Sequence, residues 1–139
     1  MTETTYAGPL PDLDDPLTAP HWAAAREHRL VLQRCRACGT FQHYPRPWCT
    51  TCLSEDLEFV PSPGQGTLYS FTVVRRTANP AFAPLVPYVY GLVDLDEGPR
   101  MTTNVVGCPV DDVTIGMRVR ARFEDVDDAG TVVLFEPDR

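Results

Sequence analysis

The stretch from Cys35 to Cys52, CRACGTFQHYPRPWCTTC, decides the fold of this chain. It holds two Cys-x-x-Cys pairs separated by ten residues, which offer four thiolates from Cys35, Cys38, Cys49 and Cys52. Four thiolates at such spacing are typical of a tetrahedral Zn²⁺ site in a zinc ribbon. Because a closed set of four ligands leaves no open position, we expect the metal to be structural. Disulfides and free core thiols are the alternatives.

The residues between the two pairs predict a short turn of chain with an apolar surface. Gly39 follows the first pair and can adopt the left-handed backbone that a tight turn needs. His43 is expected to contact solvent or a partner rather than the metal. The large apolar side chains of this stretch are candidates for partner contacts, namely Phe41, Tyr44 and Trp48.

Length and cysteine usage limit the possible classes of protein. A chain of 139 residues can bury one core and a small satellite. It has no apolar run long enough to span a membrane, and clustered thiols without a secretory signal indicate a reducing, cytoplasmic location. The fifth cysteine, Cys108, is expected to be a small buried residue.

The charge is acidic and unevenly distributed. The net charge is −7 and the isoelectric point is about 4.8, which argues against binding to nucleic acid. Residues 1–17 carry acids and no base, and they are expected to form a flexible acidic arm. All twelve basic residues are arginines, so that no Schiff-base mechanism through lysine is open to the chain.

A short helix is expected after the arm. Thr18 can cap it and Pro20 suits its first turn. Trp22 on this helix packs against the ribbon or anchors a partner. We assign residues 18–60 to the helix and the zinc ribbon, with residues 57–66 (LEFVPSPGQG) as a linker because of their prolines and glycines.

Residues 61–139 have the pattern of a small barrel. Five segments are rich in β-branched and aromatic residues: 66–74, 88–95, 100–106, 118–123 and 131–135. Such a series predicts a mainly β protein with a five-stranded oligonucleotide/oligosaccharide-binding (OB) fold. The helix that usually lies between the third and fourth strands is missing, since residues 108–117 allow one turn at most.

Two features of the barrel are candidates for binding. The loop over residues 75–87 is long and apolar, and Phe82 and Leu85 in it are expected to contact a partner. Arginines begin this loop, at Arg75 and Arg76, and recur along the fourth strand, where alternate residues share one face. The row on the strand, Arg118, Arg120 and Arg122, either pairs with acidic residues on a solvated surface or forms an anion site.

The sequence contains no motif of a self-sufficient enzyme. It lacks a phosphate-binding loop, a dinucleotide fingerprint, a nucleophile elbow and a His-Glu-x-x-His helix. The three histidines precede the barrel, and none of them lies beside an obvious nucleophile. These observations favour a protein without a catalytic site of its own.

The sequence resembles the family once grouped as domain of unknown function 35. The similar segments are PHWAAAREHRL (20–30), LVLQRCRACGTFQHYPRPWCTTC (30–52), GQGTLYSFTVV (64–74), PYVYGLVDLDEG (87–98) and IGMRVRARFED (115–125). The resemblance covers roughly residues 16–137 and implies a rubredoxin-like zinc ribbon joined to an acyl-CoA-associated OB fold. It also implies a thiolase-like partner, and it transfers the four cysteines but no catalytic residue. With acyl-CoA implied by the resemblance, the candidates to bind its phosphates are Arg75, Arg76, Arg118, Arg120 and Arg122.

Three functions follow as hypotheses. The first is a non-catalytic accessory subunit that binds and supports a thiolase-like enzyme, such as a thiolase, a sterol-carrier-type thiolase or aldolase, or an acyltransferase, acting on acyl-CoA. The second is a free-standing acyl-CoA-binding protein. The third is a nucleic-acid-binding OB-fold protein, which the acidic charge disfavours.

Overall fold

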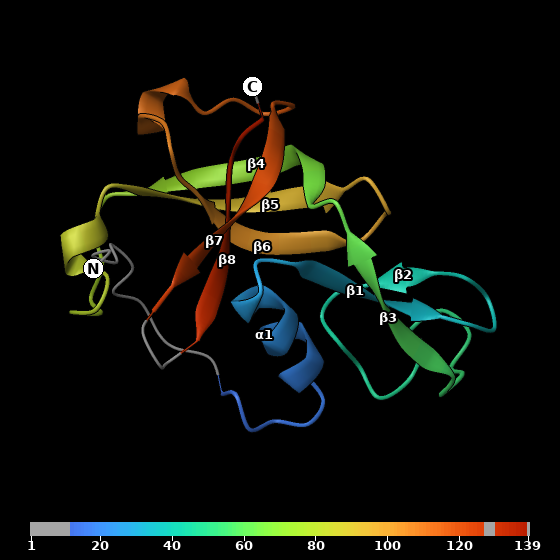
Figure 1. Cartoon of the computed structure of the whole chain (residues 1–139). Helices are drawn as coiled ribbons and strands as arrows, with labels where there is room; N and C mark the ends of the chain where they lie inside the picture. The colour runs from blue at the N-terminus through green and yellow to red at the C-terminus, as the bar shows by residue number, and fades with distance from the viewer. Residues whose placement is uncertain (1–11, 127–129, 139) are drawn as a thin grey trace.

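The chain begins its regular structure with a short helix next to the barrel. The computed structural model describes residues 12–126 and 130–138, so the predicted arm lies largely outside the described residues (Figure 1). Helix α1 (Ala19–Arg26) starts after Thr18 as predicted, with a proline in its first turn, but the Thr18 side chain makes no capping hydrogen bond. Among the described residues, no helix is long and apolar enough to cross a membrane.

A three-stranded antiparallel sheet follows the helix. Its central strand β1 (Leu30–Cys35) lies between β2 (Phe41–Gln42) and β3 (Leu57–Ser62). The prediction of a linker over residues 57–66 is therefore wrong for its first six residues. Pro61 pairs with Val31 in this register, and it is tolerated because β3 is an edge strand.

The remaining strands close into the predicted five-stranded barrel. They are β4 (Gln65–Val74), β5 (Tyr88–Leu95), β6 (Arg100–Val105), β7 (Arg118–Asp125) and β8 (Thr131–Pro137), in the order β4-β5-β6-β8-β7. The ends of β4 and β7 pair to close it. The loops contain two short 3₁₀ turns, η1 (Ala83–Leu85) and η2 (Val110–Asp112). Since η2 is a single turn between β6 and β7, the prediction of at most one helical turn between the third and fourth strands is confirmed. Asp127, Asp128, Ala129 and Gly130 predict a turn between the fourth and fifth strands, and the first three of these residues lie outside the described part of the chain.

Alternation of side chains builds the core of the barrel. On β5, Val89, Gly91, Val93 and Leu95 are buried, and they alternate with the less buried Tyr88, Tyr90, Leu92 and Asp94. Phe135 on β8 is fully buried in the same cluster. Leu30 and Leu32 of β1 also belong to this cluster, so the ribbon and the barrel share one hydrophobic core.

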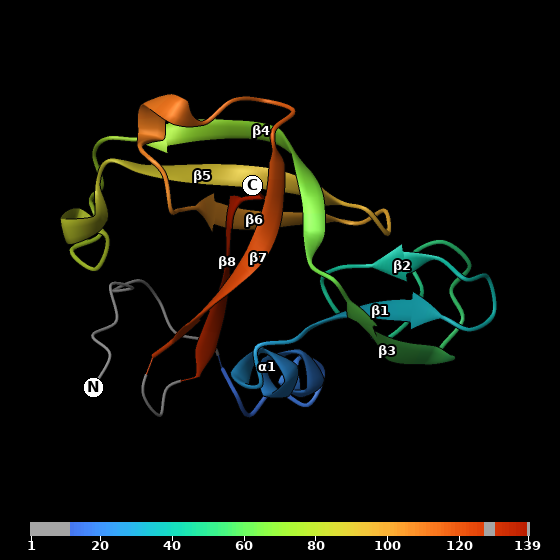
Figure 2. The same cartoon turned by 45° about the horizontal axis from the view of Figure 1, so that its top comes forward.

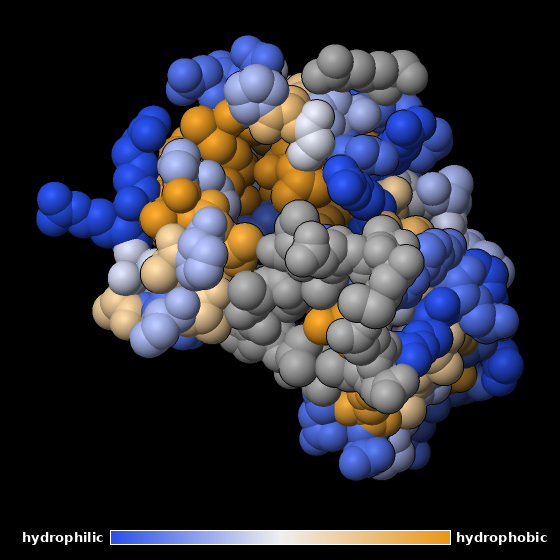
Figure 3. Space-filling view, turned by 60° about the vertical axis from the view of Figure 1, so that its left-hand side comes forward, coloured by the Kyte–Doolittle hydropathy of each residue, from blue (hydrophilic) through white to orange (hydrophobic). Residues whose placement is uncertain are grey.

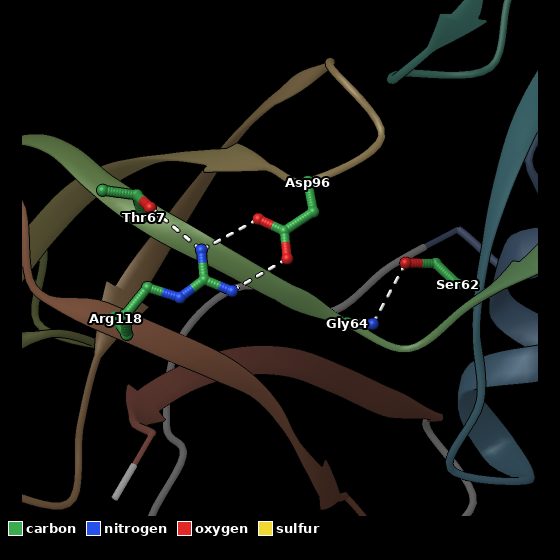
Figure 4. A network of polar contacts seen from close by, with 5 residues as sticks. All are labelled: Ser62, Gly64, Thr67, Asp96 and Arg118. Atoms are coloured by element: carbon green, nitrogen blue, oxygen red, sulfur yellow. Dashed lines mark hydrogen bonds and ion pairs between the residues drawn. The ribbon is translucent and has the colours of Figure 1, made fainter.

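The chain crosses from the ribbon to the barrel in a tight turn. Gly64 has a φ of +70°, which favours glycine, and its carbonyl accepts a 2.7 Å hydrogen bond from the amide of Ala121. A Cβ at Gly64 would lie only 2.8 Å from Cβ of Ala121. The Gly64 amide in turn donates to Oγ of Ser62 (Figure 4). The ribbon is thus held against one side of the barrel. In Figure 2, α1 lies below the barrel and beside the ribbon.

Candidate functional site

The structure brings the four predicted cysteines together at one end of the ribbon. The Sγ atoms of Cys35, Cys38, Cys49 and Cys52 all lie within 4.8 Å of one another. Sγ of Cys35 lies 3.5 Å from that of Cys52, and Cys38 lies 3.6 Å from Cys49. No other cluster of potential metal ligands occurs in the described ranges. Four convergent thiols without a fifth donor form a centre suited to a structural metal.

Two similar turns hold these thiols. The amide of Gly39 donates to the carbonyl of Cys35 in the first turn, and the amide of Leu53 donates to that of Cys49 in the second. Both Gly39 and Leu53 have left-handed backbones, with φ of 79° and 66°. Gly39 after the first cysteine pair indicated a left-handed turn in the sequence, whereas Leu53 after the second pair gave no such indication. Leu53 is also 71% exposed, which makes it an apolar surface residue that sequence reasoning missed.

Local hydrogen bonds favour the thiolate at Cys38 and Cys49, whereas the neighbouring thiol of Cys35 and burial raise the pKa of Cys52 to about 12. The hydroxyl and then the backbone of Thr40 lower the pKa of Cys38 to about 6. The amides of Thr51 and Cys52 point at Sγ of Cys49 at 3.3 and 3.5 Å. Since the thiolate is the form of cysteine that binds metals, these contacts prepare the cluster for a cation.

A pair of buried amides holds the loop between the two turns. Gln33 accepts a hydrogen bond from the amide of Arg46 and donates to its carbonyl. Gln42 accepts from the amide and hydroxyl of Thr50 and donates to the carbonyl of Trp48. These hydrogen bonds from the interior of the ribbon therefore fix the backbone at Trp48. Sequence reasoning missed both glutamines, because polar residues on a strand are usually assigned to its exposed face.

The predicted contact residues divide into two groups. Tyr44 and Trp48 are about half exposed on the ribbon loop, while Phe41 is half-buried beneath the guanidinium of Arg34 at 5.7 Å. Trp22, Phe82 and Leu85 are all half-buried. His43 does not extend into solvent, because its ring packs 5.6 Å from the ring of His21.

Three of the predicted contact residues, Trp22, Tyr44 and Phe82, line one cleft of about 650 Å³. It lies between the α1–ribbon side and the barrel strands β5, β6 and β8. Tyr88 and Tyr90 also line it, and sequence reasoning missed them. Their spacing of two residues on a strand was the available signal, since it places both on the outward face of β5.

Leu85 lies elsewhere, at a smaller cavity of about 250 Å³ beside the half-buried Cys108 and Val110. On the face of the molecule that carries η1, hydrophobic side chains gather around a hollow (Figure 3). This apolar region borders the loop over residues 75–87. Leu85 and Phe82 are both half-buried, and the ring of Phe82 stacks on that of Tyr88 at 5.5 Å.

The arginines of the barrel differ in their pairing. Arg118 donates to both carboxylate oxygens of Asp96 at 2.8 Å and also to Thr67 (Figure 4). Arg120 and Arg122 share the carboxylate of Glu136, at 3.3 and 3.7 Å. These contacts fit the alternative of a solvated, acid-paired face.

Arg75 and Arg76 stand apart from this pairing. Both are exposed at the end of β4, and neither makes an ion pair with a residue that the structure describes. Asp94, Asp96 and Glu136, by contrast, already neutralise arginines on neighbouring strands. Of the five candidate arginines, these two therefore have guanidinium groups available to an external anion.

Two family models match the chain in the order of its two units. The first, described as the ChsH2 rubredoxin-like zinc ribbon domain, matches residues 22–58, and the second, described as the ChsH2 C-terminal OB-fold domain, matches residues 59–124. The two models meet within β3. Together they cover the cysteine cluster, most of the residues that line the cleft, and the barrel strands β4 to β6 with β7 as far as Glu124.

Curated relatives extend the comparison. A "DUF35 domain-containing scaffold protein" of Methanocaldococcus jannaschii is 33% identical over 85% of this chain and 84% of its own length. The "Probable enoyl-CoA hydratase alpha subunit" of Thermomonospora curvata is 43% identical over 82% of this chain, which spans only 35% of that relative. The "Benzoylsuccinyl-CoA thiolase subunit BbsA" of Thauera aromatica is 33% identical over 71% of this chain and 63% of its own length.

A solved structure agrees with these matches over nearly the whole fold. A chain of the structure described as "Ltp2-ChsH2(DUF35) aldolase" superposes with a TM-score of 0.80 at 39% identity. The match covers 91% of this chain and 98% of the other. The similarity therefore includes the placement of the ribbon against the barrel.

Proposed function

Because the chain belongs to the DUF35 family of ChsH2-type proteins, which join a zinc ribbon to an OB fold, we propose that it is an accessory subunit of a thiolase-like enzyme. That enzyme, a thiolase, aldolase or acyltransferase, acts on acyl-CoA, and this chain binds and supports it without a catalytic site of its own. The observation that carries the proposal is the match to a chain of the Ltp2-ChsH2(DUF35) aldolase along 98% of that chain. The likeness to a benzoylsuccinyl-CoA thiolase subunit supports the same class of partner.

We propose that the four cysteines hold one Zn²⁺. When bound, the ion supplies a cross-link between the two ribbon turns and no reactive position, because all four ligands come from the protein. The chain also lacks lysine, and none of the four cysteines lines the cleft. Catalysis therefore belongs to the partner in this proposal.

The partner docks on the apolar surface of the ribbon loop and of the η1 loop. Trp48 and Tyr44 offer large, half-exposed rings on a backbone that the buried glutamines hold still. Anchors on a stiff loop lose little entropy on binding. Leu53 extends this surface on the ribbon, and Phe82 and Leu85 form a second contact on the barrel.

Arg75 and Arg76 are the best placed of the five arginines to bind the phosphates of CoA. Guanidinium groups recognise phosphate in a bidentate manner, and these two make no ion pair with the described residues. Arg118, Arg120 and Arg122 would first have to leave their carboxylates. Their paired state and the net charge of −7 also oppose binding to nucleic acid.

Co-expression with a neighbouring thiolase-like enzyme tests the proposal. The two chains should elute together from size-exclusion chromatography, and the enzyme should lose activity or solubility when this chain is omitted. The alternative, a free-standing acyl-CoA-binding protein, predicts a monomer that binds acyl-CoA alone. Separate elution combined with such binding would replace the first function by the second.

A further inference from the structure

The cleft between the ribbon and the barrel is lined by rings from both units. On the ribbon side, the ring of His21 lies 4.6 Å from that of Trp22 and 6.4 Å from that of Tyr44. On the barrel side, Phe82 stacks on Tyr88 at 5.5 Å. The cleft volume of about 650 Å³ is in the range of small-molecule sites. The molecule thus presents two facing aromatic walls.

The place of the cleft on the barrel is the place where OB folds bind ligands. Its floor comes from β5 and β6, which are the second and third strands of the barrel, and Phe82 comes from the loop between the first and second. In OB folds, the face of these strands and that loop carry the ligand. The position and the ring lining are independent observations that agree.

The charges in the cleft are already neutralised. Arg100, the cation in its lining, donates to both oxygens of Asp94, with its guanidinium 3.6 Å above the ring of Tyr69. Burial lowers the pKa of both His21 and His43 to about 4, so both rings are neutral at pH 7. An anionic ligand would therefore find no free positive charge here, in contrast to Arg75 and Arg76.

Polar groups in the lining are available for neutral hydrogen bonds. Within the described residues, the hydroxyl groups of Tyr88, Tyr90 and Thr102 have no hydrogen-bond partner. Nδ1 of His21 is buried in the wall, also without a partner. Uncharged ring walls with a few hydroxyl groups at their edges match a flat ring compound that carries hydroxyl or carbonyl substituents.

We propose that this cleft is a binding site for an uncharged, flat ring system with one or two polar substituents. The ring inserts between Trp22 and Tyr44 on one side and Tyr90 on the other. Its substituents reach the hydroxyl groups on the barrel floor. Because Tyr44 and Phe82 of this cleft also belong to the proposed docking surface, binding is tested on the chain without the partner enzyme.

The test is a titration of the metal-loaded chain with 2-naphthol at pH 7.5, followed by ¹H–¹⁵N NMR. We expect saturable 1:1 binding with shifts of the Trp22 indole and of β5 and β6 amides. Trp22→Ala and Tyr90→Ala should each weaken binding by roughly tenfold, as loss of a stacking partner does. The matched control Trp48→Ala removes the same ring type as Trp22 at a position outside the cleft and should leave the Kd within about twofold.

Two further arms decide the class of ligand. 2-Naphthoate has the same rings with a negative charge and should bind at least about tenfold more weakly. Trp22→Leu keeps an apolar wall without the ring, and it serves if the alanine variant does not fold. Absence of saturation, equal binding of naphthoate, or full affinity in both the Trp22→Leu and Tyr90→Ala variants would overturn the proposal. Preference for a disaccharide such as cellobiose over 2-naphthol would overturn it as well.

Discussion

Gln33 and Gln42 lie directly opposite each other in β1 and β2, and Nε2 of Gln42 donates a hydrogen bond to Oε1 of Gln33. Both side chains are buried. The pair connects the ribbon sheet to the loop that carries Trp48. A hydrogen bond in the interior therefore helps to fix the position of an apolar side chain on the surface. Loss of one amide would leave its partners buried without a hydrogen bond.

Gln42→Leu should therefore destabilise the chain by about 1–3 kcal/mol, because Gln33 and the amide of Thr50 lose their partner in the interior. Urea unfolding of the metal-loaded protein measures this change. The control is Gln65→Leu, which replaces an exposed glutamine at the start of β4 and should change stability by less than about 0.5 kcal/mol. Equal effects of the two substitutions would contradict a structural role for the amide pair.

Cys49→Ser should abolish metal binding and disorder the ribbon, since the metal contributes directly to folding of such modules. Elemental analysis should give one zinc for each native chain and almost none for the variant. Cys108→Ser is the matched control, because Cys108 lies against the barrel core outside the cluster. A full zinc content in Cys49→Ser, or iron in the native protein, would disprove the assignment.

Trp48→Ala should weaken assembly with the thiolase-like partner by about 1–3 kcal/mol, as truncation of a large interface anchor does. Phe82→Ala should act in the same direction. Arg120→Ala should have little effect at moderate salt, because Arg120 is half exposed and already paired with Glu136. Titration of the enzyme with zinc-loaded variants measures these changes. Abolished binding in Arg120→Ala with full binding in the other two variants would place the interface on the charged face.

Acidification should destabilise the chain through His21. Burial lowers its pKa from 6.5 to about 4 in the folded state, so the unfolded chain takes up a proton first as the pH falls. Stability is therefore complete above pH 6.5, declines as the pH falls below it, and levels off near pH 4. By about pH 5 the loss from His21 alone should be roughly 2 kcal/mol.

Urea midpoints at pH 7.5, 6 and 5 test this window. His21→Gln should reduce the slope between pH 6.5 and pH 5 by about half, because burial also lowers the pKa of His43 to about 4. His28→Gln, at an exposed position beside Asp125, should keep most of the native slope. A profile that is unchanged in His21→Gln would show that the titration of His21 does not control acid stability.

The barrel strands could be predicted because their signal is local. Alternation along residues 88–95 and 118–123 needs only a few neighbouring side chains, and the structure has strands there, extended by two residues in β7. The spacing of the four cysteines is equally local. β3 was missed because Pro61 and Pro63 flank its end and resemble a linker, although an edge strand accepts Pro61.

The cleft could not be predicted from the sequence. Its walls come from Trp22 and Tyr44 before the barrel and from Tyr88 and Tyr90 within it, so no single window of sequence contains both. The pairing of Arg118 with Asp96 also depends on the fold, since it joins β7 to the end of β5 across 22 residues. Tertiary placement decides both features.

Leu30 and Leu32 lie in the barrel core, and the strand that carries them ends at Cys35, one of the four cysteines proposed to hold zinc. Release of the metal at the tip of the ribbon is therefore transmitted along β1 into the interior of the other unit. The chain should melt in a single cooperative transition, and a chelator should lower the denaturation midpoint reported by barrel residues as much as the midpoint reported by the ribbon. A barrel fragment cut where the two family models meet would lose both leucines and leave a gap in its core.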